Sequence, residues 1–131
     1  MPKGVVGRVA GRRERGQGAY ALGVGAEAAA CAALVRDGWT ILGQRLRTAA
    51  GEVDAVAEKD GLLAIIEVKA RPKLADAAAA VSARQRARLL GAAEILLAEN
   101  PGWGLVGVRF DVLLVDKAGA VRRIVDAFRQ E

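Results

Sequence analysis

Three charged side chains suited to a metal-dependent site lie on two neighbouring stretches that have the composition of strands. Asp54 lies in residues 52–58, and Glu67 and Lys69 lie in residues 62–70. Carboxylates are natural ligands for hard cations such as Mg²⁺ or Mn²⁺. A lysine beside them can orient a water molecule or stabilise negative charge that develops on a phosphate. These residue types meet the needs of metal-assisted phosphodiester hydrolysis.

The Asp60-Gly61 dipeptide between the two stretches predicts a two-residue hairpin, because a type I′ turn needs positive φ at both central residues. The resulting register places Asp54 directly opposite Glu67, and Glu52 and Lys69 share their face. Opposed carboxylates destabilise a sheet, whereas a divalent cation can bridge the gap of roughly 5 Å between strands. The alternative is an exposed cross-strand charge cluster, which the apolar residues around these charges disfavour.

The other face of this hairpin carries only apolar side chains, so another element must cover it. On that face we expect Val53, Ala55 and Ala57 against Ala64, Ile66, Val68 and Ala70.

The rest of the chain predicts an α/β domain with two long helices and five strands. Gly38 is a suitable C-terminal stop for the first helix, on which Glu27 falls on the line of residues that should face the core. The apolar fourth strand is expected inside the sheet and the fifth at an edge. The expected helices are residues 18–36 and 82–100, and the expected strands are 39–46, 52–58, 62–70, 105–115 and 121–128.

Composition sets further bounds. The 131 residues suit one domain, carry a net charge of +5 and hold no histidine, which excludes histidine-dependent catalysis and leaves acid, base and metal chemistry to carboxylates and lysine. The first twenty residues hold +4 of that charge, so residues 1–17 are expected to form a basic flexible arm before a single domain, residues 18–131. The arm either contacts a polyanion or serves as a solubilising tail.

No apolar run is long enough for a membrane helix, and the N-terminal segment has no features of a secretory signal. The lone cysteine cannot form an intrachain disulfide. We therefore expect a cytoplasmic protein with no membrane contact.

The ordered motifs carry a family resemblance. An acidic residue on one strand followed by Glu-x-Lys on the next resembles the restriction-endonuclease-like, or PD-(D/E)xK, superfamily, whose Holliday-junction resolvase branch has a further glutamate on its first helix. More closely, the chain resembles the YraN family of small bacterial proteins, for which a nuclease role is inferred from fold. The motifs are Gly25-Ala26-Glu27, Gly38-Trp39-Thr40-Ile41-Leu42, Arg47, Gly51-Glu52-Val53-Asp54, Ile66-Glu67-Val68-Lys69-Ala70-Arg71, Arg109-Phe110-Asp111-Val112 and Ala127-Phe128.

The resemblance implies a restriction-endonuclease-like α-β-β-β-α-β core, with a mixed sheet flanked by helices. By the same resemblance Asp54 and Glu67 would bind Mg²⁺ or Mn²⁺, Glu27 would complete or orient the metal shell, and Lys69 would assist the water. Gln85 has two interpretations of equal weight. A glutamine on the second long helix often joins the site in related nucleases, but Ser82-x-x-Gln85 is also a capping box.

The expected function is metal-dependent hydrolysis of DNA, with branched or single-stranded structures among the candidate substrates. The alternative is a non-catalytic nuclease-fold module that binds nucleic acid or a protein partner. Resolvase-like proteins often act as dimers, so a homodimer is also open. Candidate contacts to nucleic acid are Arg47, Arg71 and Arg84; Arg86 and Arg88 could join them, although a solvated helix face explains Arg84, Arg86 and Arg88 nearly as well. Arg109 and Asp111 are expected to form a supporting pair.

Overall fold

The computed structural model describes residues 18–71 and 82–128, so the predicted arm, residues 1–17, lies outside the described residues. Two helices and five strands follow in the expected order. Neither helix in these ranges is long and apolar enough to cross a membrane. The elements are α2 (Gly18–Arg36), β1 (Thr40–Thr48), β2 (Gly51–Lys59), β3 (Leu62–Ala70), α3 (Ala83–Glu99), β4 (Gly107–Val115) and β5 (Val121–Phe128).

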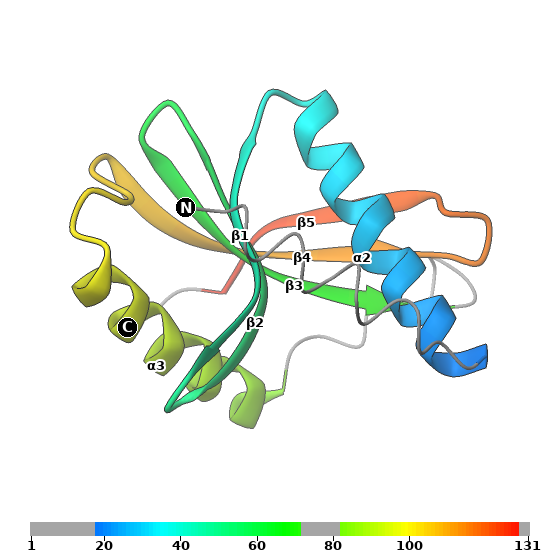
Figure 1. Cartoon of the computed structure of the whole chain (residues 1–131), viewed down its shortest axis with the longest axis horizontal. Coiled ribbons are helices and arrows are strands. Elements are labelled where there is room, and N and C mark those ends of the chain that lie inside the picture. Colours follow the sequence, from blue (N-terminus) through cyan, green and yellow to red (C-terminus); the bar gives the residue numbers. More distant parts are fainter. Residues whose placement is uncertain (1–17, 72–81, 129–131) are drawn as a thin grey trace.

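The strands form one mixed sheet in the order β1-β2-β3-β4-β5. All neighbours are antiparallel except β3 and β4, which are parallel and are therefore joined by a crossover that contains α3. Helices α2 and α3 lie on opposite sides of the sheet (Figure 1). The predicted α/β fold is confirmed, with β4 inside the sheet and β5 at an edge.

Two local signals in the sequence account for the helix boundaries. Gly38, at φ +92°, ends α2 in a Schellman motif, in which Trp39 N–H donates to Leu34 O at 2.9 Å and Gly38 N–H to Val35 O at 3.0 Å. Ser82 begins α3 as its N-cap. These ends fix where Trp39 enters the sheet and where α3 starts.

The Asp60-Gly61 turn forms as predicted, because both residues have positive φ, +52° and +82°. The expected register holds from Lys59 opposite Leu62 to Ala55 opposite Ile66, where the β2–β3 ladder ends. Asp54 and Glu67 would have formed the next pair, and they are not register partners. The prediction that Asp54 and Glu67 pair directly is therefore wrong, because the ladder ends one pair before them.

Each helix covers its own apolar core. The core beneath α3 contains Val53 and Val56, whereas the core beneath α2 contains Ala55 and Ala57. Val53 was expected on the face of Ala55 and Ala57, so strict alternation fails at Asp54. Across from this point Arg45 has φ +50°, which interrupts the regular geometry of β1.

Candidate functional site

The strands β2 and β3 separate beyond Ala55 and Ile66, whereas β3 stays paired with β4 as far as Ala70. We call this separation the strand fork. At the fork the Oδ2 atom of Asp54 accepts a hydrogen bond of 2.8 Å from the Val68 N–H. The carboxylate thereby satisfies a backbone donor that the ended ladder no longer pairs with β2. A side chain of β2 is thus fixed to the backbone of β3 at the centre of the candidate site.

Electrostatics at the fork favour the neutral form of Asp54. Burial first, and then the charge of Glu67, raise the pKa of Asp54 from 3.8 to about 7, and the charges of Glu27 and Glu52 contribute less. The Val68 N–H opposes this rise because it stabilises the carboxylate. Among the described residues no lysine or arginine forms an ion pair with Asp54. Asp54 is therefore the acidic residue of the fork that lacks a cation.

Glu67 is buried, at 8% exposure, and lies between two cations. Its Oε1 atom is 3.0 Å from Arg88 Nη2 on α3, and its Oε2 atom is 3.7 Å from Lys69 Nζ. The structure therefore brings Glu67 and Lys69 together as the sequence predicts. The structure adds Arg88, a residue of α3, which reaches the fork from the side of the sheet opposite to α2.

Glu27 approaches from α2, the helix on the other side of the sheet. Its Oε1 atom is 3.0 Å from Arg45 Nε, and the guanidinium belongs to the β1 residue that has positive φ. The charge of Glu27 contributes to the raised pKa values of Asp54 and of Cys31, which places it in the same electrostatic environment as both. The acidic residues predicted for the site therefore converge from α2, β2 and β3.

The donor chemistry of this cluster fits a hard divalent cation, because it is made of carboxylate oxygens. After burial, the charges of Glu67, Glu27 and Glu52 contribute to the raised pKa of Asp54, and a cation there would oppose those charges. As they stand, however, the described side chains include no group of three potential ligands arranged to hold an ion. Arg45 and Arg88 supply positive charge to Glu27 and Glu67 instead.

Gln85 lies in the capping box of α3. Its Oε1 atom accepts a hydrogen bond of 2.9 Å from Ser82 N–H, while Ser82 Oγ accepts one of 3.1 Å from Gln85 N–H. Of the two interpretations of this residue, the structure shows the capping one.

The arginines expected to contact nucleic acid lie in different settings. Arg47 is exposed and its Nε atom is 4.0 Å from Glu52 Oε2. Arg71 donates to the Ala70 carbonyl at 2.8 Å, and Arg84 is exposed on the first turn of α3. A long cationic side chain on a surface can contact a phosphate backbone, and Arg84 has this exposure.

Sequence reasoning missed the roles of Arg45 and Arg88. Arg88 had a usable signal, because it lies four and eight residues before the buried Ala92 and Leu96, in one row of the helix. That row points to the sheet, whereas Arg86 is exposed. Arg45 had no such signal, since nothing in residues 40–48 indicates positive φ at a non-glycine residue.

A second charged cluster lies on the α2 side of the sheet. Asp111, at 1% exposure, pairs with Arg109 Nε at 3.1 Å and with Arg123 Nη2 at 3.3 Å. Both guanidinium groups also lie over the ring of Trp39, at 5.2 and 4.8 Å from its centroid. The expected Arg109 and Asp111 pair is thus present, and the cluster ties β4 and β5 to Trp39, the residue before β1.

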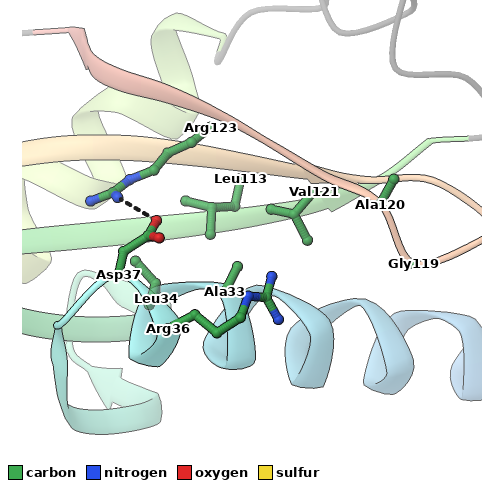
Figure 2. A pocket seen from close by; sticks show the side chains of 9 residues that line it. All are labelled: Ala33, Leu34, Arg36, Asp37, Leu113, Gly119, Ala120, Val121 and Arg123. Carbon is green, nitrogen blue, oxygen red and sulfur yellow. Dashed lines mark ion pairs between the residues drawn. The ribbon is translucent and has the colours of Figure 1, made fainter.

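A cavity of about 230 Å³ opens beside this second cluster (Figure 2). Arg123 extends from β5 toward Asp37 across its wall, with their charged atoms 3.6 Å apart. The cavity contains none of the residues predicted for the site. Its lining is Ala33, Leu34, Arg36, Asp37, Leu113, Gly119, Ala120, Val121 and Arg123.

Known proteins similar to this chain match it over most of its length. A UPF0102 protein of Granulibacter bethesdensis is 60% identical over 115 residues, which cover 88% of this chain and 73% of that protein. UPF0102 proteins of Azorhizobium caulinodans and Rhodopseudomonas palustris are 44% and 43% identical, over 91% and 84% of this chain and 91% and 85% of their own lengths. Residues 26–115 match the model of the uncharacterised protein family UPF0102. The chain therefore belongs to this family, the YraN family that its motifs resemble.

Proposed function

We propose that this chain is a metal-dependent nuclease that hydrolyses phosphodiester bonds of DNA with Mg²⁺ or Mn²⁺. The main support is Asp54 at the strand fork, a partly buried carboxylate whose pKa is raised to about 7, first by burial and then by the charges of Glu67 and Glu27. Strongly perturbed carboxylates cluster at functional sites, where a fold holds charge at a cost in stability. Lys69, beside Glu67, adds a cation to the same site.

In this proposal Asp54 and Glu67 would hold the metal, and Glu27 would complete or orient its shell. A bound Mg²⁺ or Mn²⁺ would supply a polarised phosphoryl group and a water of lowered pKa. The Val68 N–H keeps one oxygen of Asp54 in place, so the carboxylate is oriented before any ligand arrives. Lys69 stabilises the negative charge that develops on the phosphate, because its ammonium lies at the edge of the carboxylate cluster.

Cleavage assays test the activity directly. The full chain is incubated with labelled duplex, single-stranded, flap and four-way DNA in Mg²⁺ or in Mn²⁺. We expect cleavage of at least one substrate, and Lys69→Ala should lower its rate by roughly a hundredfold or more, as loss of one electrostatic group does in other sites. Its DNA affinity should fall by no more than one phosphate contact supplies.

Calorimetry tests the metal site without reference to activity. The native chain should bind Mn²⁺, and Asp54→Asn should lose this binding because the substitution removes a charged ligand. Glu94→Gln is a matched control, since Glu94 is an exposed carboxylate on α3. Equal Mn²⁺ affinity in the native chain and in Asp54→Asn would exclude this site.

One observation favours the alternative of a non-catalytic binding module. Glu27 and Glu67 already have arginine partners at 3.0 Å, so the cluster can be neutralised by the protein itself. A native chain that binds the DNA panel but cuts none of it in either metal, and that binds no Mn²⁺, would establish this alternative. The cluster would then be a buried ionic network.

A further inference from the structure

We infer that Arg88 is an internal counterion that competes with the divalent cation for Glu67 and, once displaced, binds a phosphate of the DNA. The inference rests on the proposed function and deepens it, because it assigns one residue to both the metal-free and the DNA-bound site. Its starting point is the ion pair of 3.0 Å between Arg88 Nη2 and Glu67 Oε1.

Glu67 cannot keep all of its present partners when a divalent cation arrives. Lys69 lies at its Oε2 atom and Arg88 at its Oε1 atom, so both oxygens face a positive charge. A third cation at this carboxylate would be repelled by the other two. The side chain of Arg88 is 33% exposed and that of Lys69 is 11% exposed, so Arg88 is the partner that can move into solvent.

The stem of Arg88 is held while its head is partly free. A Cβ atom added at Gly51 would lie 2.3 Å from Arg88 Cγ and 2.5 Å from Cδ, so the stem runs against the backbone at the start of β2. The guanidinium beyond it has further donors, because Nη2 alone has a hydrogen-bond partner among the described residues and the side chain is 33% exposed. A planar donor group on a fixed stem suits a phosphate, which arginine can bind through two hydrogen bonds.

Arg88 lies on α3 in a row of side chains that runs from the fork to the surface. Arg84 lies one turn before it in the same row and is exposed, so the two cations form a line from solvent to Glu67. Arg86 lies off this row and is exposed. The structure thus provides a matched control, a neighbouring arginine of the same helix without the Glu67 contact.

Calorimetry with Mn²⁺ alone measures the competition on the full chain. Arg88→Met removes the competing charge, so Mn²⁺ should bind roughly fivefold more tightly than to the native chain, as expected for release of a partly exposed ion pair. Arg86→Met should bind Mn²⁺ as the native chain does. If Arg88 instead orients Glu67 as a ligand, its removal would weaken Mn²⁺ binding, and this opposite sign would overturn the inference.

The second readout is binding to a duplex with phosphorothioate linkages, which retain the backbone charge and resist cleavage. In Mn²⁺ the salt dependence of Arg88→Met should be shallower than that of the native chain by roughly 0.9, the slope for one phosphate contact. Without metal the two slopes should agree, because Glu67 then holds Arg88. The difference between Arg86→Met and the native chain should not depend on Mn²⁺.

The outcomes separate this inference from the proposed function. If the native chain binds Mn²⁺ and cuts DNA while Arg88→Met shows neither tighter metal binding nor a metal-dependent change of slope, the inference fails and the nuclease proposal stands. If the native chain binds no Mn²⁺, both fail. Should Arg88→Met not fold, as judged by circular dichroism, Arg88→Gln replaces it with the same expected directions.

Discussion

Asp54 links the stability of the metal-free protein to pH. Its folded-state pKa of about 7 lies above the ordinary 3.8, so the folded state binds more protons than the unfolded state between these values. The stability that protonated Asp54 contributes is therefore complete below about pH 4 and is lost as pH rises through about 7. We therefore expect the contribution of Asp54 to the free energy of unfolding, measured in urea without metal, to fall as pH rises from about 4 to about 7.

Asp54→Asn isolates the effect from other titrating groups. The variant cannot ionise at this position, so its stability relative to the native chain should rise with pH from 4 to 8, by a few kcal/mol at most, since one pKa unit corresponds to about 1.4 kcal/mol. Added Mn²⁺ should stabilise the native chain at pH 8 and leave the variant unaffected. A stability difference that is constant with pH would show that Asp54 has an ordinary pKa.

Cys31 offers a chemical reporter of charge at the same site. Burial first, and then the charges of Glu27 and Asp54, raise the pKa of its thiol to about 11, so alkylation by iodoacetamide at pH 8 should be slow. A cation at the fork would oppose those charges, and we expect Mn²⁺ to speed alkylation several-fold. Glu27→Gln should speed it without metal, whereas Glu94→Gln, on the other helix, should not.

At the scale of elements, the start of β2 lies so close to α3 that a residue larger than glycine at position 51 would be strained. Gly51 has φ +140° and lies against the stem of Arg88, so Gly51→Ala must distort the backbone and displace that stem. We expect the free energy of unfolding in urea to fall by about 1–3 kcal/mol. Gly102→Ala should be nearly neutral, because Gly102 has no positive φ and no neighbour within 4 Å of an added Cβ.

Local patterns were enough to predict the elements and most of the register. Asp60-Gly61 specified its turn because few other residue pairs accept two positive φ values, and the turn then fixed the pairing as far as Ala55 and Ile66. Gly38 and Ser82 specified the ends of helices for equally local reasons. Short-range chemistry of this kind can be read without knowledge of the fold.

The electrostatic detail of the site could not be predicted in the same way. Glu27 meets Arg45, and Glu67 meets Arg88, only because α2 and α3 pack on opposite faces of the sheet. The β2–β3 ladder ends at Ala55 and Ile66, whereas β3 stays paired with β4, a strand far away in sequence. Long-range packing therefore decided which carboxylate has no cationic partner among the described residues, and residue spacing did not contain that information.

At the scale of the whole molecule, the charge is unevenly distributed along the chain. Residues 1–17 hold +4 of the net +5, so we predict that their deletion weakens DNA binding and makes its salt dependence shallower, by roughly 0.9 for each phosphate that these residues neutralise. Fluorescence anisotropy over a range of salt concentrations measures both. An unchanged slope would assign the segment to solubility alone.

The two tryptophans of the chain fall in different layers, which gives each layer its own optical signal. Trp39 belongs to the apolar core beneath α2, and Trp103 packs against the core beneath α3. Trp39→Phe and Trp103→Phe would each leave one emitter, so thermal melting of the layers can be followed separately. If the two layers unfold together, the tryptophan fluorescence of each variant and its far-UV ellipticity should change at the same temperature, in a single cooperative transition. Separate midpoints would reveal a partly folded state in which one helix has detached and the fork is open.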